Sequence, residues 1–284
     1  MVDLSIVIVS WNVKNLLREC LDSILANYEQ LTVEIFVVDN ASGDGTAAMV
    51  KLEFPQIKLI ENKNNLGFTK ANNQGIKLAA GQYIFILNPD TIIKPGALSQ
   101  LVKFMNEHPQ CGAVGPRLLN ANTTLQPSCS AFPTLKTQLL TALFLDTFLP
   151  KWGHAETKEV DQPMGAAILL RREALDKIGV FDENIFIFYD EVDLCYRLKK
   201  AGYRIFFTPE AQVVHYGGQS FAQWKGLRAS LRGGYIWRKS RNYFFKKHYG
   251  FWQVPILMAL DALQLILALG LFYALFKLIS SLVM

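Results

Sequence analysis

Residues 33–42 read VEIFVVDNAS, a short apolar run that ends in a carboxylate, an amide and a hydroxyl. Runs rich in β-branched residues and bounded by turn residues are typical of strands. Similar apolar runs occur at residues 4–9, 58–60, 83–87 and 113–115. Open parallel sheets bind ligands at the carboxyl ends of their strands, so Asp39 and Asn40 also indicate where a binding site lies.

Helical patterns separate these runs. Apolar side chains recur at helical spacing between Leu16 and Leu25, residues 71–80 behave similarly, and residues 98–105 follow Pro95, which suits a first helical turn. Strands that alternate with helices indicate βαβ units. The sequence therefore predicts an α/β fold with a mainly parallel central sheet.

The later part of the chain is less regular. Between residues 117 and 163, Pro, Thr and Ser interrupt the periodicity, and we expect a long excursion from the sheet there. Long loops of that kind are usually functional or mobile. Strands are predicted again at residues 165–170, 203–208 and 212–215, with a helix over residues 190–201.

The composition, 51% hydrophobic and 19% charged, is that of a folded globular protein and argues against disorder. The net charge of +5 is uneven, because eight Lys and Arg residues lie between Lys225 and Lys247, and no acid lies between Glu210 and Asp261. This asymmetry indicates one local anionic partner, for which a membrane surface fits best. Nucleic acid is not expected, because no nucleic-acid reading motif accompanies the charge.

An apolar run follows the basic segment. Residues 256–276 contain Asp261 and Gln264 as their strongly polar members. A membrane-spanning helix needs about 20 apolar residues. A helix lying in the membrane interface and a helix packed on the domain stay open as alternatives, because Asp at the centre of a span costs about 2.5–3.5 kcal/mol. Aromatic residues among the preceding cations suit the lipid headgroup zone, although a solvated basic helix is also possible.

The first residues of the chain and the spacing of its cysteines indicate an intracellular setting. The first residues lack a basic region, and their apolar run ends at Ser10-Trp11-Asn12, so they predict a strand and not a signal peptide. The four cysteines lie far apart and form no Cys-x-x-Cys pair. We expect free thiols in a reducing compartment.

Two strand ends carry candidate ligand-binding groups. The Asp39 carboxylate can accept a hydrogen bond from the imide N–H of uracil or thymine, whereas residues 42–44 can equally be capping and turn residues. Asn88 and Asp90 lie two positions apart around Pro89, so both can reach one Mg²⁺ or Mn²⁺ ion. An Asx turn without metal is the alternative. Neither Gly-x-Gly-x-x-Gly nor a Walker loop follows the first strand.

Acids gather where a helix is predicted to begin. Asp190, Glu191 and Asp193 favour a helix start, but capping does not need all three. At least one carboxylate can therefore face a cleft and remove a proton from a hydroxyl. His215 ends a predicted strand, where it can be a structural residue or a metal ligand.

Many short motifs occur in a fixed order between residues 4 and 250. They are Val9-Ser10-Trp11-Asn12, Val38-Asp39-Asn40-Ala41-Ser42, Asn65-Leu66-Gly67-Phe68, Asn73-Gln74-Gly75, Leu87-Asn88-Pro89-Asp90, Gly165-Ala166, Phe181-Asp182-Glu183, Asp190-Glu191-Val192-Asp193-Leu194-Cys195, Val214-His215, Arg241-Asn242-Tyr243-Phe244 and Lys247-His248-Tyr249-Gly250. In this order they resemble a family 2 glycosyltransferase of the GT-A fold, a nucleotide-sugar-binding Rossmann-like domain. The bacterial rhamnosyltransferase-like branch is the most similar. Each motif alone would be weak, and their agreement in order makes the resemblance specific.

The resemblance implies a donor site and a metal site. Asp39 would bind the nucleobase, and the residues around the nucleotide would be Ser10, Asn12, Asn65, Gly67 and Asn73. Asn88-Pro89-Asp90 stands where the family has its Asp-x-Asp metal motif, so Asp90 would be the principal ligand and His215 a distal one. Asn88 is a neutral residue in place of an acid, which implies weaker binding of Mg²⁺ or Mn²⁺.

The resemblance also implies an acceptor site and a base. Glu191 would be the catalytic base, with Asp190 as the fallback. Asp193 would cap the helix or bind the acceptor beside Gly165 and Ala166. The base would take the acceptor proton while oxygen attacks the anomeric carbon in line. One displacement inverts the configuration, and the metal stabilises the leaving diphosphate.

The expected activity is transfer of a sugar, first of all rhamnose from TDP-rhamnose, to a hydroxyl of a polyprenyl-diphosphate-linked saccharide in cell-surface polysaccharide synthesis. A polyprenyl-phosphate glycosyltransferase and a non-catalytic sugar-nucleotide-binding membrane protein are the alternatives. We expect a catalytic domain at residues 1–220, a basic aromatic segment at 221–254 and a hydrophobic helix at 255–284. Cations beside the catalytic domain predict the cytoplasmic face of the inner membrane.

Overall fold

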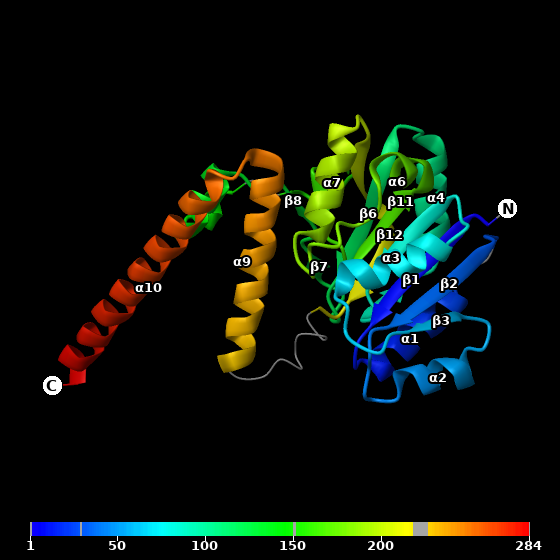
Figure 1. Cartoon of the computed structure of the whole chain (residues 1–284), viewed down its shortest axis with the longest axis horizontal. Coiled ribbons are helices and arrows are strands. Elements are labelled where there is room, and N and C mark those ends of the chain that lie inside the picture. The colour runs from blue at the N-terminus through cyan, green and yellow to red at the C-terminus, as the bar shows by residue number, and fades with distance from the viewer. Residues whose placement is uncertain (1, 29, 150–151, 218–226, 284) are drawn as a thin grey trace. The chain divides into compact units, whose positions relative to one another are not determined.

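The computed structural model describes the whole chain except residues 1, 29, 150–151, 218–226 and 284, and its elements are shown in Figure 1. The chain divides into two compact units. Unit 1 comprises Met1–Ala131 and Trp152–Ser240, and unit 2 comprises Phe132–Lys151 and Arg241–Met284. The domain boundary predicted at residue 220 lies outside the described residues.

A ten-stranded sheet forms the centre of unit 1. Its main path is β3-β2-β1-β4-β11-β6-β12-β5, with β7 paired to β6 and β9 paired to β12; β8 and β10 form a separate pair. The strands are β1 (Leu4–Ser10), β2 (Val33–Asp39), β3 (Lys58–Glu61), β4 (Tyr83–Leu87), β5 (Thr91–Ile93), β6 (Cys111–Leu119), β7 (Leu125–Gln126), β8 (Cys129–Ser130), β9 (Lys158–Glu159), β10 (Gln162–Pro163), β11 (Ala167–Arg171) and β12 (Arg204–His215).

Parallel pairing brings several strand ends to one edge of the sheet. β1 pairs in parallel with β2 and β4, β2 with β3, and β6 with β12. β11 runs antiparallel between β4 and β6, and β5 runs antiparallel beside β12. The predicted α/β fold with a mainly parallel centre of the sheet is therefore confirmed, and β5, β7, β9 and β11 are the antiparallel strands of this sheet.

Helices cover both faces of this sheet. On one face, Leu4, Ile6 and Ile8 pack in a core with side chains of α1, α2 and α4. On the other face, α3 approaches β1 so closely that a Cβ at Gly75 would lie 2.5 Å from Val7 Cγ1. Burial on both faces explains why the strands are continuous apolar runs and do not alternate with polar residues. The helices that the structure describes in unit 1 are α1 (Lys14–Leu25), α2 (Thr46–Glu53), α3 (Phe68–Leu78), α4 (Ala97–Glu107), α6 (Arg172–Ile178), α7 (Asp190–Lys200) and the first part of α9 (Leu227–Tyr249).

The predicted excursion divides between the two units. Its early and late parts add β7, β8, β9 and β10 to unit 1, whereas α5 (Leu135–Ala142) and the 3₁₀ helix η1 (Asp146–Phe148) belong to unit 2. The strands predicted at residues 203–208 and 212–215 form one strand, β12, with an irregularity between Thr208 and Gln212. Such a bulge bends a strand without ending it.

Unit 2 also contains the end of α9 and α10 (Gln253–Val283). Within α10, Gln253–Gly270 is long and apolar enough to cross a membrane by length and composition. The acid in this stretch is paired: Arg241 Nη1 and Nη2 donate to the two Asp261 oxygens at 2.8 and 2.7 Å. Gln264 Nε2 donates to the Thr141 carbonyl at 3.4 Å. Both strongly polar side chains of the apolar run therefore have partners inside unit 2.

The loop before α7 is held against the start of α3. Phe68 N donates to Phe186 O at 2.7 Å, and Thr69 Oγ1 donates to Ile185 O. The Asn73 side chain donates to Phe181 O at 2.9 Å and accepts from Phe181 N at 3.1 Å. These bonds fix the segment that leads into the acidic helix α7.

Gly67, the residue before α3, leaves room for this loop. It has φ +87°, and an added Cβ would lie 2.6 Å from Phe186 Cδ2 and 2.7 Å from Phe186 O. Gly179 has a similar backbone, with φ +81° and ψ 169° against φ +87° and ψ 170° at Gly67, and nothing lies within 4 Å of a Cβ added there. The two glycines therefore share a backbone conformation and differ in crowding.

We expect Gly67→Ala to lower the free energy of unfolding by about 4 kcal/mol, because it adds overpacking to the penalty of a backbone conformation that is essentially restricted to glycine. Gly179→Ala should cost only about 2 kcal/mol, the backbone penalty alone. Urea unfolding of the two variants measures the difference. Equal losses would show that the contact with Phe186 is not what requires glycine at position 67.

Candidate functional site

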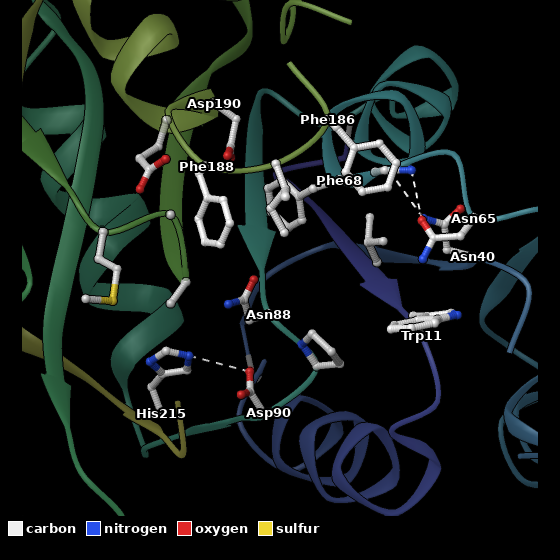
Figure 2. A pocket seen from close by; sticks show the side chains of 18 residues that line it. Trp11, Asn40, Asn65, Phe68, Asn88, Asp90, Phe186, Phe188, Asp190 and His215 are labelled. Carbon is white, nitrogen blue, oxygen red and sulfur yellow. Dashed lines mark hydrogen bonds and ion pairs between the residues drawn. The ribbon is translucent and has the colours of Figure 1, made fainter. Parts of the chain in front are cut away.

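A cavity of about 390 Å³ lies at the carboxyl ends of β1, β2 and β4 in unit 1. Figure 2 shows Asp90 and His215 on one side of it and Asp190 on the opposite side, whereas Trp11 and Asn40 line a third region. The cavity thus brings together groups that are far apart in the sequence. Its position agrees with the edge at which open parallel sheets bind ligands.

The turn after β4 presents Asn88 and Asp90 to the cavity. Asn88 N donates to Ala166 O at 2.8 Å, Thr91 Oγ1 donates to Asn88 O at 2.7 Å, and Tyr216 N donates to Asp90 O at 3.0 Å. These bonds hold the turn through its main chain and Thr91. Both the Asn88 and the Asp90 residues line the cavity.

His215 faces Asp90 in a fixed orientation. Its Nε2 lies 3.5 Å from Asp90 Oδ1, and its Nδ1 lies 2.8 Å from Gln126 Oε1. Gln126 Nε2 donates to Asn120 Oδ1 at 3.1 Å and to His215 O at 3.4 Å, which fixes the direction of the amide. Because Oε1 can only accept, Nδ1 carries a hydrogen, and in the neutral form of the ring it is the Nε2 lone pair that faces Asp90.

This arrangement suits a cation. An imidazole lone pair and a carboxylate oxygen that face each other both prefer a positive charge between them, and Asn88 adds a neutral oxygen nearby. Within the described residues, no group of three or more His, Cys, Asp or Glu side chains forms a site that could hold a metal without other ligands. Substrate oxygens or water would therefore have to complete the coordination.

The Gln126 contact predicts the tautomer of His215. In protein labelled with ¹⁵N histidine, His215 should be protonated at Nδ1, and Gln126→Leu should remove that preference. His108 is an internal control, because its Nδ1 lies 2.8 Å from Phe104 O and does not involve Gln126. An Nε2-protonated His215 in the unsubstituted protein would contradict the arrangement.

The acids at the start of α7 have different surroundings. Asp190 and Glu191 both line the cavity, and Asp190 is 5% exposed. Burial raises the pKa of Asp190 well above its ordinary value, and the negative charge of Glu191 adds to this shift. Burial also raises the pKa of Glu191. A Cβ at Gly165 would lie 3.3 Å from Glu191 Cβ, so the glycine leaves space for this side chain.

Asp193 lies outside the cavity lining. It is fully buried, and Arg197 Nε donates to its Oδ2 at 2.8 Å. The same guanidinium donates to the carbonyls of residues 178–180. Asp193 therefore anchors the loop before α7 through Arg197, and of its two predicted roles, helix capping and acceptor binding, its position in the first turn of α7 outside the cavity lining favours the first.

A pair of substitutions separates these roles. Because burial raises the pKa of Asp190 in the folded state, the protonated side chain stabilises the fold relative to the charged one. This stabilisation is complete below about pH 4 and is lost as the pH rises through the folded-state pKa. Asp190→Asn should therefore raise the melting temperature by several degrees near neutral pH, and the gain should vanish toward about pH 4.

The matched control, Asp193→Asn, removes a buried partner of Arg197 and should lower stability by about 2 kcal/mol at neutral pH. Thermal melts over a pH series distinguish the two variants. A decrease in melting temperature of similar size in both variants would show that the buried charge of Asp190 does not destabilise the folded protein.

The backbone before α7 is unusual. Phe188 and Tyr189 have φ values of +63° and +62°, a conformation that non-glycine residues rarely adopt. Ser240 Oγ donates to Ile187 O at 2.8 Å, and the Trp237 ring packs edge-on against Tyr189 at 5.7 Å between centroids. The first part of α9 therefore supports the loop that carries the acid pair.

Two buried polar atoms lie at the ends of β1 and β2. Ser10 Oγ and Asp39 Oδ1 have no hydrogen-bond partner within the part of the chain that the structure describes. Their residues are neighbours in the β1–β2 register, and burial raises the pKa of Asp39. Neither residue lines the cavity, although their chain neighbours Val9, Trp11 and Asn40 do. Since buried polar groups are almost always hydrogen-bonded, this unpartnered pair suits a ligand that brings its own polar groups.

The other predicted donor residues divide into two groups. Asn65 and Gly67 line the cavity, where Asn65 Oδ1 accepts from Asn40 Nδ2 and from Gly67 N, both at 3.0 Å. Asn12 and Asn73 do not line it. Asn12 Oδ1 accepts from Gly43 N at 2.7 Å, and Asn73 holds the loop at Phe181, so both position neighbouring loops. The predicted acceptor residues Gly165 and Ala166 line the cavity.

Sequence reasoning missed several residues of this site. Phe186 and Phe188 line the cavity, Gln126 orients His215, and Ser240 supports the loop before α7. The two phenylalanines belong to the apolar run before the acid pair, which was a usable signal. Gln126 and Ser240 act through partners 89 and 53 residues away, and no local pattern indicates such contacts.

A family model described as Glycosyl transferase family 2 matches residues 5–179. The chain is 30% identical over 247 residues to the N-acetylglucosaminyl-diphospho-decaprenol L-rhamnosyltransferase of Mycobacterium tuberculosis, covering 79% of this chain and 78% of the relative. It is 25% identical over 223 residues to a low-salt glycan biosynthesis hexosyltransferase of Haloferax volcanii, covering 75% and 67%.

Solved structures show the same fold. GalNAc-T7 with UDP, GalNAc and Mn²⁺ matches with a TM-score of 0.60 at 17% identity, covering 86% of this chain and 50% of that one. A mannosyltransferase from Pyrobaculum calidifontis in complex with GDP-Man and Mn²⁺ matches with a TM-score of 0.54 at 21% identity, covering 96% and 80%. The GT-A fold expected from the sequence is therefore confirmed.

Proposed function

The chain belongs to glycosyl transferase family 2, and we propose that it transfers a sugar, with inversion, from a nucleoside diphosphate to a hydroxyl of a lipid-linked saccharide. The observation that carries this proposal is the shared cavity. Asp90 and His215 lie on one side of it, and Asp190 and Glu191 also line it (Figure 2). A cation site and a carboxylate base are the two groups that such a displacement requires.

Asp90, His215 and Asn88 would hold Mg²⁺ or Mn²⁺ together with the donor diphosphate. When bound, the metal neutralises charge on the leaving group. Gln126 keeps the Nε2 lone pair of His215 directed toward that position. The presence of Mn²⁺ in two solved proteins of the same fold supports a divalent ion here, without deciding between the two metals.

Glu191 is proposed as the base. Burial raises the pKa of both carboxyls, and the charge of Glu191 adds to the shift at Asp190, so the pair favours a state with one proton. Two neighbouring carboxyls that interact in this way commonly divide the roles of acid and base. Glu191 would accept the acceptor hydroxyl proton as the oxygen attacks the anomeric carbon opposite the diphosphate, and this single displacement inverts the configuration.

The buried pair at the ends of β1 and β2 supports a nucleotide donor. The unpartnered Asp39 Oδ1 can accept from the imide N–H of a uracil or thymine ring, and Ser10 Oγ is beside it in register. Trp11 and Asn40 line the cavity next to these two residues. TDP-rhamnose is our first choice of donor, supported by the rhamnosyltransferase name of the mycobacterial relative.

The acceptor is proposed to be a saccharide on a polyprenyl diphosphate. The printed name of the mycobacterial relative specifies N-acetylglucosaminyl-diphospho-decaprenol, and α10 contains a stretch apolar enough to cross a membrane. We place the catalytic part, predicted at residues 1–220, at the cytoplasmic face of the inner membrane. The cations of residues 221–254 would face anionic headgroups, and α10 would attach the chain to the bilayer.

We expect Glu191→Gln to reduce transfer to a hydroxyl acceptor by about 100- to 10,000-fold while donor binding is retained, because only proton removal is lost. The matched control is Glu173→Gln, an exposed acid on α6 away from the cavity, which should keep full activity. Donor binding is measured by thermal shift with a panel of nucleotide sugars and Mn²⁺.

Two outcomes would change this assignment. Loss of activity in Asp190→Asn with full activity in Glu191→Gln would move the base to Asp190. Full activity in both variants would point to a phosphate acceptor, which needs little help from a base, and hence to the polyprenyl-phosphate alternative. The anomeric configuration of the product, determined by NMR, tests inversion separately.

A further inference from the structure

Unit 2 contains an exposed apolar segment that the proposed reaction does not use. Residues 143–148, which we call the apolar tip, read LFLDTF and follow α5 directly. Phe148 is 72% exposed and Phe144 47%, and Leu143 and Leu145 are also exposed. The acid in the tip, Asp146, accepts from Thr141 Oγ1 at 2.7 Å. Large apolar side chains gathered at one exposed place usually mark an interaction surface.

The tip belongs to the same compact unit as the candidate membrane helix. Gln264 of α10 is bonded to the Thr141 carbonyl of α5, two residues before the tip. Among the α10 side chains that the structure describes, the large exposed ones are Ile256, Met258, Leu265, Ile266, Leu269, Phe272 and Tyr273. Within the described part of unit 2, Asp261 and Gln264 therefore have internal partners, and large apolar side chains are exposed on both α10 and the tip.

The charge of unit 2 selects an anionic partner. Arg241 and Asp261 neutralise each other at 2.7 Å, whereas Lys136 on α5 and Lys246 on α9 are exposed cations. Apolar side chains beside exposed cations are the combination that binds the interface of an anionic bilayer. A second protein chain would meet the same apolar groups but gives no reason for the cations.

We propose that the apolar tip inserts into the membrane interface as a second attachment point beside α10. Leu143, Phe144 and Phe148 would enter the acyl boundary, and the exposed lysines of unit 2 would contact anionic headgroups. Membrane attachment would then be the function of the excursion between β8 and β9, which does not line the cavity. The proposal rests on the membrane attachment proposed for α10, and the following experiment tests the two separately.

The full-length protein carries Phe148→Cys, in a Cys129→Ser background, and is labelled with the environment-sensitive dye NBD. The remaining cysteines, Cys20, Cys111 and Cys195, are buried. On vesicles that contain phosphatidylglycerol, we expect a blue shift, an increase of at least about twofold in NBD emission, and quenching by spin-labelled lipid. The matched control is Leu52→Cys on α2 of unit 1, which is 82% exposed and should show none of these changes.

Co-sedimentation with the same vesicles separates the possible failures. Sedimentation of the protein with an unchanged label at position 148 would overturn the tip proposal and leave attachment through α10 intact. Failure to sediment would overturn both, although transfer to a soluble acceptor could still be measured. A blue shift that depends on protein concentration and not on lipid would identify a second copy of the chain as the partner, and would also overturn the proposal.

Discussion

The parallel pairing of β1 with β2 and with β4 is the constraint on which the rest of the structure depends. It aligns three strands so that their carboxyl ends open at one edge. Because helices bury both faces of these strands, the polar groups that we propose as ligand-binding groups lie at or just beyond their ends, at Ser10, Asp39 and Asp90. The antiparallel β11 then carries Gly165 and Ala166 to the same edge from the other side of β4. One sheet topology thus determines where donor, metal and base can meet.

Most of this framework could be predicted, because its signals are local in the sequence. Apolar runs of strand length end directly in Asp39 and in Asn88-Pro89-Asp90, and parallel topology brings such ends together without further information. For the excursion at residues 117–163, the sequence predicted an irregular segment but not its helices, strands or contacts. Its division between two units depends on the contacts of α5 with α10, which join residues more than 100 positions apart and leave no periodic pattern.

The acids of α7 show why residue roles were harder to predict than their location. Asp190, Glu191 and Asp193 occupy one helical turn, and sequence spacing alone gives them the same reasons to be there. Tertiary surroundings separate them: Asp193 meets Arg197, whereas Asp190 and Glu191 line the cavity. Asn73 is a similar case, because a side-chain amide that could bind a nucleotide instead uses both its ends on the loop at Phe181.

The left-handed backbone at Phe188 and Tyr189 has a consequence for any shortened form of the protein. Such conformations cost on the order of 1–3 kcal/mol each and persist only where neighbours enforce them. Here the neighbours are Trp237 and Ser240 on α9. A fragment cut at residue 220 would keep Asp39, Asp90 and both acids of α7 yet lose these supports, so we expect it to retain the proposed nucleotide binding better than the proposed sugar transfer. The working enzyme therefore extends past the last strand of its sheet.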